Sequence, residues 1–145
     1  MTRYLLGAAT FFAGLFAALQ PPINAGLARR TGSLEAATIS FAVGFVAILL
    51  VALVAGRGSF SGIRTAPWWQ LTGGLIGATF VWVNLAVVPQ LGVAGLLAGS
   101  IAGQLAGGLM IDNFGLLGMA RSPLTAGRLV GVALLVAGAV LVLRR

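Results

Sequence analysis

Residues 34–55 read LEAATISFAVGFVAILLVALVA, and no polar side chain occurs between Phe41 and Ala55. A helix of about 20 mostly apolar residues is long enough to cross the hydrocarbon core of a bilayer. Glu35 would lie in the first turn, where a negative charge suits the helix dipole, and Ser33 is suited to cap that turn. The stretch therefore predicts a transmembrane helix and an all-α integral membrane protein.

The composition of the whole chain supports this prediction. Of 145 residues, 59% are hydrophobic and 8% are charged, whereas soluble domains carry roughly 25% charged residues. A water-soluble enzyme is excluded, because a globule of this length would lack polar side chains for its surface. The absence of Cys and His excludes thiol catalysis, disulfides, imidazole metal sites and Ser-His triads. We expect no enzymatic activity, no cofactor and no metal.

Four further apolar runs are long enough to span a membrane, and short connections join them as in a bundle of antiparallel neighbours. The first run also has features of a secretory signal, but its length favours a retained span. We expect Pro89 to end the third span and Ser122-Pro123 to start the fifth. The predicted architecture is one transmembrane domain, residues 1–145, with five spans at about 4–25, 34–55, 69–88, 93–111 and 125–143.

Nine arginines and two acids give a net charge of +7. The arginines stand in pairs and singles between apolar runs, which is typical of membrane-flanking charges rather than of a nucleic-acid surface. Five spans place Arg29, Arg30, Arg144 and Arg145 on one side of the membrane. They place on the other side, with the N-terminus, Arg3, Arg57, Arg64, Arg121 and Arg128.

This near-equal charge distribution is a weak orienting signal, because Lys and Arg normally gather on the cytoplasmic side. Two interpretations remain. Either the chain inserts in both orientations and works as an antiparallel homodimer of ten helices, or one span is miscounted and the balance is accidental. An inverted homodimer would reproduce the inverted-topology repeat that many transporters carry within one chain.

Polar side chains interrupt three of the predicted spans. Gln20 and Asn24 share a helix face around Pro21 and Pro22, which remove two N–H donors and break the helical hydrogen bonding. Broken helices mark binding sites in transporters, although these prolines would also suit a helix that ends near the surface. Asn84 in the third span, with Ser100 and Gln104 in the fourth, completes the candidate substrate-binding set. Such groups also serve as hydrogen-bond partners between helices.

A stripe of glycines runs along the fourth predicted span, and two acids lie at span ends. Glycines at intervals of four residues let helix backbones approach closely, either within one subunit or across a dimer interface. The stripe consists of Gly95, Gly99, Gly103 and Gly107. Glu35 suits a helix N-terminus, and Asp112 is suited to pair with Arg121; both remain candidates for a coupling role. No acid lies at a span centre, so a proton relay through a buried carboxylate is not supported.

Several motifs of this sequence resemble the YdcZ-like proteins, over nearly the whole chain. The motifs are ALQPPINAGL at 18–27, Ser40-Phe41 with Gly44, Pro67-Trp68-Trp69, Asn84 with VPQLG at 88–92, AGQL at 102–105 and IDNFGLLG at 111–118. The resemblance implies a half-size, five-span branch of the drug/metabolite transporter superfamily, located in bacterial inner membranes and working as a dimer. Asn113 departs from the pattern, since the family commonly has His there.

Residues and resemblance together indicate a secondary transporter for a small organic solute, with alternating access between two inverted protomers. A small channel or pore is the first alternative, and a non-transporting membrane assembly subunit is the second. The expected partners are the lipid bilayer, the solute and a second copy of the chain, without nucleic acid. The pattern does not indicate which solute is carried, in which direction, or with which coupling ion.

Overall fold

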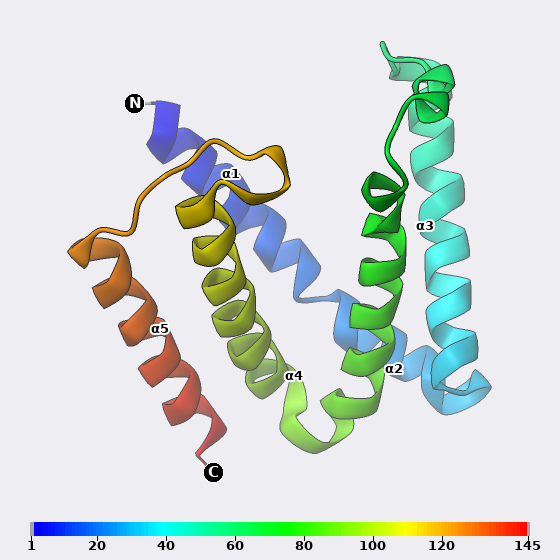
Figure 1. Ribbon diagram of the computed structural model, residues 1–145. Helices are drawn as coiled ribbons and strands as arrows, with labels where there is room; N and C mark the ends of the chain where they lie inside the picture. The colour runs from blue at the N-terminus through cyan, green and yellow to red at the C-terminus, as the bar shows by residue number, and fades with distance from the viewer. Residues whose placement is uncertain (1, 145) are drawn as a thin grey trace. The chain divides into compact units, whose positions relative to one another are not determined.

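The computed structural model describes residues 2–144, and for Thr2 and Arg3 it describes the backbone alone. The topology assignments that rest on the Arg3 side chain and on Arg145 lie outside the described residues. The described chain consists of α-helices joined by short 3-10 helices and coil, with no strand among residues 2–144 (Figure 1). The elements are α1 (Thr2–Ala17), α2 (Gln20–Thr31), α3 (Ser33–Ala55), η1 (Phe60–Arg64), η2 (Trp68–Thr72), α4 (Gly73–Phe114), η3 (Leu116–Gly118) and α5 (Ala126–Leu143).

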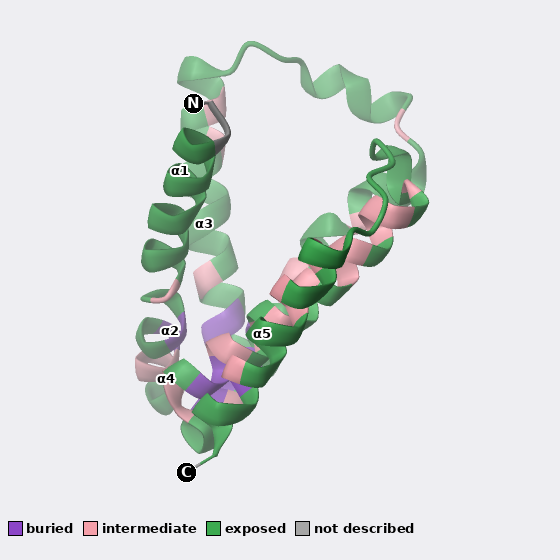
Figure 2. Cartoon of the chain, turned by 90° about the vertical axis from the view of Figure 1, so that its left-hand side faces the viewer, coloured by how far each residue is buried: buried purple, intermediate pink, exposed green. Residues whose placement is uncertain are grey.

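Four helical segments among the described residues are long and apolar enough to cross a membrane. They are Tyr4–Thr31, Ser33–Ala55, Trp68–Phe114 and Ala126–Leu143. Large apolar side chains are exposed along all of them, and Figure 2 shows that exposed residues dominate the helices. An apolar surface of this kind suits a lipid environment rather than water. The prediction of an all-α membrane protein is therefore consistent with the structure.

The chain forms two compact units, residues 1–89 and 90–145. In the first, α2 packs along the start of α3, and α3 runs beside the first part of α4 (Figure 1). The buried core of this unit consists of Ala36, Ala37, Val81 and Leu85. Small alanines on α3 let α4 approach closely. Asn84, which neighbours Val81 and Leu85 on α4, is buried by the same packing. In the second unit, Gly95 packs against Leu143 of α5: a Cβ at residue 95 would lie 3.2 Å from Leu143 Cδ2.

The first apolar segment is interrupted upstream of the two prolines. Helix α1 ends at Ala17, and the Leu19 N–H donates to the Phe16 carbonyl at 3.1 Å in a tight turn. Pro21 and Pro22 then occupy the first turn of α2, where a missing N–H has little cost and the fixed φ of proline suits a helix. The prolines thus begin a helix that continues to Thr31. The segment between the first two predicted spans, residues 26–33, is therefore largely helical.

The start of α3 differs from the sequence prediction in its cap. Gly32 occupies the N-cap position with φ 101° and ψ 158°, and no side chain caps the helix. The expectation that Ser33 caps α3 is therefore wrong, because Ser33 is already the first helical residue. Glu35 does lie in the first turn, and its carboxylate folds back over Gly32 so closely that a Cβ there would collide with Oε2.

Within α4 the helical geometry is interrupted at Gly92, with φ 69° and ψ 172°. Pro89 lies inside the helix, so the expected end of the third span at Pro89 is wrong by about one turn. Proline can adopt the φ of a helix, although its missing N–H removes one backbone hydrogen bond. Residue 92 has a positive φ, which favours glycine, so the helix is interrupted there. The α-helical start is also later than expected, because Trp68–Thr72 forms the 3-10 turn η2.

The connection from α4 to α5 begins at Gly115, which is left-handed with φ 63°. Helix α5 begins at Ala126, and the Thr125 hydroxyl oxygen accepts a hydrogen bond from the Arg128 N–H at 3.3 Å. Thr125 is therefore the N-cap, and the expected helix start at Ser122-Pro123 is wrong. Ser122 instead belongs to the connection, where its N–H donates to the Asp112 carbonyl at 2.8 Å.

Candidate functional site

A small cavity with three amide side chains in its lining lies between α2 and the first part of α4. Its volume is about 10 Å³, which suits a single water molecule. Helix α2 contributes residues from its first two turns, and α4 contributes residues on the facing side. The lining residues are Gln20, Pro21, Asn24, Val81, Asn84 and Leu85. We call this space the amide cavity.

Two amides of this cavity are deeply buried and lack hydrogen-bond partners. Asn24 is 6% exposed and Asn84 9% exposed, and neither side chain is hydrogen-bonded to another described residue. No polar side-chain atom in the described chain is completely enclosed without a partner, so the two amides retain access to open space. Buried polar groups are normally paired, and leaving them unpaired is costly. The cavity is therefore suited to receive a small hydrogen-bonding group.

The structure brings together three of the five predicted substrate-binding residues. Gln20 and Asn24 reach the amide cavity from α2, and Asn84 reaches it from α4. Ser100, half-buried, and Gln104, exposed, belong to the second compact unit. Their part in the same site stays a prediction.

Two apolar pockets on the same unit were not found from the sequence. The first, which we call the α3 groove, has a volume of about 310 Å³ and shares Gln20 with the amide cavity. Its remaining lining residues are Ser40, Phe41, Gly44, Phe45 and Ile48. Small residues such as Gly44 among large apolar ones leave this space open. The small residue between large apolar ones was the only sign of a pocket in the sequence. Because α3 is apolar on every side, the sequence did not show which of its faces lines the pocket.

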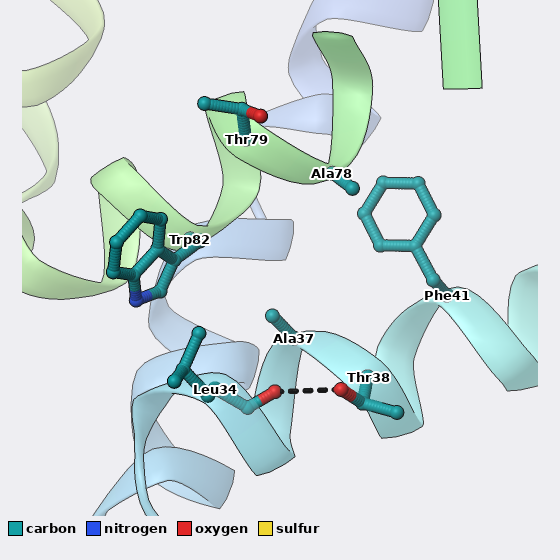
Figure 3. A pocket seen from close by; sticks show the side chains of 7 residues that line it. All are labelled: Leu34, Ala37, Thr38, Phe41, Ala78, Thr79 and Trp82. Atoms are coloured by element: carbon teal, nitrogen blue, oxygen red, sulfur yellow. Dashed lines mark hydrogen bonds between the residues drawn. The ribbon is translucent and has the colours of Figure 1, made fainter. Parts of the chain in front are cut away.

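The second pocket, which we call the Trp82 pocket, lies between α3 and α4 and has a volume of about 400 Å³ (Figure 3). Phe41 lines both this pocket and the α3 groove. The Thr38 hydroxyl donates to the Leu34 carbonyl at 2.9 Å, and the Thr79 hydroxyl donates to the Leu75 carbonyl at 2.9 Å. Both hydroxyl hydrogens are thus used within their own helices, which leaves the pocket predominantly apolar.

The polar residues of the second unit form a separate cluster around the α4–α5 connection. Asp112 forms an ion pair with Arg128, not with Arg121 as the sequence suggested. Arg128 is placed for this by the cap of α5, and its Nη1 also donates to the carbonyl and the hydroxyl of Ser122, each at 3.0 Å. Arg121 Nε donates instead to the Asn113 carbonyl at 3.0 Å. These bonds hold the α4–α5 connection together, and a coupling role of Asp112 stays a prediction.

The remaining sequence candidates are placed as follows. Glu35 lies at the start of α3 and lines none of the three spaces described above. Beyond Gly95, the glycine stripe meets nothing in the described chain: a Cβ at Gly99, Gly103 or Gly107 would have no atom within 4 Å. No group of three His, Cys, Asp or Glu side chains in residues 2–144 is arranged to hold a metal ion.

Comparison with known proteins agrees with this picture of an apolar helical protein. Residues 5–141 match the family model described as "Putative inner membrane exporter, YdcZ". Over 85 residues the chain is 41% identical to the inner membrane protein YdcZ of Escherichia coli (strain K12). That alignment covers 57% of this chain and 55% of the relative, so it spans about half of each. No solved structure matches.

The family match extends over almost the entire chain, and it includes all the helices that contribute to the amide cavity. The description of the family names an exporter of the inner membrane and no chemical reaction. Together with several apolar helices of membrane-spanning length, the match identifies a multi-pass protein of the inner membrane. The chain belongs to the YdcZ family.

Proposed function

We propose that this protein is a secondary transporter that exports a small organic solute and binds it through Gln20, Asn24 and Asn84. The main support is the pair of buried amides, Asn24 and Asn84, which meet at one cavity without hydrogen-bond partners. Polar groups inside membrane helices are costly and commonly functional. Gln20 and Asn24 also lie just after the interruption between α1 and α2, as substrate-binding groups do at broken helices in many transporters.

The proposal includes five membrane spans. A single helix over Trp68–Phe114 would be about 70 Å long at 1.5 Å per residue, more than twice the hydrocarbon thickness of about 30 Å. The interruption at Gly92 divides it into residues 73–91 and 93–114. Each part has about the length of one span. The break at Gly92 therefore supports five spans rather than four.

The proposal also includes an antiparallel homodimer. With five spans the arginines divide five to four between the two sides, which gives little preference for one orientation. Five spans correspond to one half of such an inverted repeat, and two oppositely inserted copies would provide both halves. Alternating access would then exchange two equivalent conformations of the pair.

The test is counterflow in proteoliposomes across a panel of small organic solutes. We expect saturable transport by the native chain and at least a tenfold loss with Asn84→Ala or Gln20→Ala. The matched control is Gln70→Ala, an exposed glutamine of η2 that lines none of the three spaces. Transport that both site substitutions leave unchanged contradicts the proposed site. Ohmic single-channel current without counterflow would indicate a pore, and a stoichiometric protein partner without transport would indicate an assembly subunit.

A further inference from the structure

Three adjoining spaces follow one another in residues 20–85: the amide cavity, the α3 groove and the Trp82 pocket. Gln20 lines the first two, and Phe41 lines the last two. None of the residues that line them carries a charge. The polar end is the deeply buried one, since Asn24 and Asn84 are both more than nine-tenths buried. The lining thus changes from uncharged amides at one end to apolar side chains at the other, and this limits the chemical class of ligand that fits.

The amide cavity determines the polar part of the ligand. Each carboxamide offers N–H donors and an oxygen acceptor, and none carries a charge. A space of about 10 Å³ admits a group of the size of one water molecule. A hydroxyl or a carbonyl oxygen meets both conditions. An ammonium or carboxylate group would be buried there without an opposite charge, which is strongly unfavourable.

The α3 groove determines the apolar part. A volume of about 310 Å³ is at the lower end for small-molecule sites, which are mostly apolar with a few oriented polar groups. Its lining is apolar apart from Gln20 and Ser40. It therefore suits an aromatic ring or a short branched chain attached to the polar group.

Phe41 limits how far this apolar part can extend. Its ring lies over the Gly77 α-carbon, because a Cβ at residue 77 would be 3.6 Å from Phe41 Cζ. The same ring lines the Trp82 pocket, where Figure 3 shows it opposite Trp82 with Ala78 beside it. Phe41 thus separates the groove from a second apolar pocket.

We propose that residues 20–85 form a binding site for a small uncharged amphipathic molecule. Its hydroxyl-sized polar group occupies the amide cavity, and its apolar body lies in the α3 groove up to Phe41. The inference rests on the proposed function, because it assigns the class of substrate to the transport site. It excludes organic cations and anions as preferred substrates.

Three probes that share a benzyl group test the polar end: benzyl alcohol, benzylammonium and toluene, which lacks the polar group. Binding to the purified full-length chain in detergent is measured by equilibrium dialysis, with empty micelles as the reference for partitioning. We expect benzyl alcohol to bind about tenfold or more tightly than benzylammonium. Asn84→Leu should weaken benzyl alcohol about 3- to 10-fold, the effect of one or two hydrogen bonds, and leave toluene unchanged. Unchanged toluene binding also shows that the variant is folded.

A second substitution tests the apolar end. Gly44→Leu places a side chain in the α3 groove, and a Cβ at residue 44 meets no atom within 4 Å. It should weaken both benzyl alcohol and toluene at least fivefold. Gly14→Leu is the matched control, because Gly14 on α1 is equally open and lines none of the three spaces. We expect this control to bind all three probes as the native chain does.

Two results would overturn the inference. Equal binding of benzylammonium and benzyl alcohol would show that the site does not reject charge. Equal binding of toluene and benzyl alcohol, insensitive to Asn84→Leu, would show an apolar groove of the kind that lipid acyl chains fill. If transport still depends on Asn84 but the carried solute is charged, the substrate class is wrong and the transporter function stands. If transport depends on neither Asn84 nor Gln20, the proposed function itself fails.

Discussion

Asn24 on α2 and Asn84 on α4 line the same cavity, although the whole of α3 lies between them in the sequence. Both are buried, and neither side-chain amide is hydrogen-bonded to another residue of the described chain. The packing of α3 against both helices holds them there, through Ala36 and Ala37 on one side and Val81 and Leu85 on the other. A small apolar core thus holds the two amides at one cavity.

We predict that Asn24→Leu stabilises the protein by about 1 kcal/mol and abolishes transport. Replacing an unpaired buried amide by an apolar side chain of similar size removes a desolvation penalty. Thermal unfolding in detergent and counterflow in proteoliposomes give the two measurements. Asn113→Leu is the control of opposite sign: Asn113 Oδ1 accepts from the Leu124 N–H at 3.2 Å, so its loss should destabilise by about 1 kcal/mol. A destabilised Asn24→Leu variant would show that Asn24 has a structural partner.

We predict that Gly32→Ala lowers the free energy of unfolding by about 1–3 kcal/mol. Residue 32 has φ 101° and ψ 158°, a region that is essentially confined to glycine. The new Cβ would also collide with the Glu35 carboxylate. Adding Glu35→Ala should recover only the part of the loss that comes from the collision. Gly14→Ala, at an open helical position, should stabilise slightly, and a comparable effect at both glycines would contradict the strain at Gly32.

We predict that the Asp112–Arg128 ion pair contributes less than about 1 kcal/mol to stability. Both side chains are about one-third exposed, and solvent screens such pairs. A double-mutant cycle with Asp112→Asn and Arg128→Gln measures the coupling energy. Arg128→Gln alone should cost more than Asp112→Asn, because Arg128 also donates twice to Ser122. A coupling energy that is large and insensitive to salt would refute this assignment of a screened surface pair.

We predict that removing Arg29 and Arg30 fixes the orientation of the chain. The five-to-four balance then becomes five to two, so the side that holds the N-terminus should be cytoplasmic in nearly all molecules. Reporter fusions at the C-terminus measure the orientation. If the working unit is antiparallel, this variant should be inactive alone and should regain transport with a variant that lacks Arg3, Arg121 and Arg128. Full activity of a chain locked in one orientation would exclude the antiparallel dimer.

Arg29 and Arg30 also lie in the last turn of α2, near the proposed site in the sequence. The orientation experiment therefore needs a second design, in which arginines are added on the opposite side and both residues are kept. Orientation and activity should then follow the charge balance in the same way. A loss of activity confined to the deletion variant would assign a local role to Arg29 or Arg30.

The long apolar segments could be predicted from the sequence with small errors. Residues 34–55 and 125–143 were expected as spans, and α3 and α5 cover Ser33–Ala55 and Ala126–Leu143. Hydrophobic length decides such segments, and it depends little on their neighbours. Their ends were less predictable. A cap depends on local φ and ψ, which the sequence does not show. The expected cap at Ser33 and the expected start at Ser122-Pro123 were therefore wrong, and Gly32 and Thr125 are the N-caps.

The candidate site could be predicted only in its polar residues. Gln20, Asn24 and Asn84 are conspicuous because amides are rare in apolar helices, and the structure places all three at one cavity. The α3 groove and the Trp82 pocket depend on which faces of α3 and α4 turn toward each other. An apolar helix without a polar face carries no such information in its sequence. The partner of Asp112 was likewise decided by the cap of α5, which positions Arg128.

The turn at Ala18 and Leu19 divides the first membrane segment into two helices, and only the second helix carries the amides. Gln20 and Asn24 lie after the turn, on the helix that packs against α3. Helix α1 lies before it, and its described side chains are exposed from Tyr4 to Ala17. The segment is therefore two helices separated by a turn rather than one continuous helix. Because the buried core lies on α3 and α4 and packs against α2, the position of the amides depends on those three helices and not on the exposed side chains of α1.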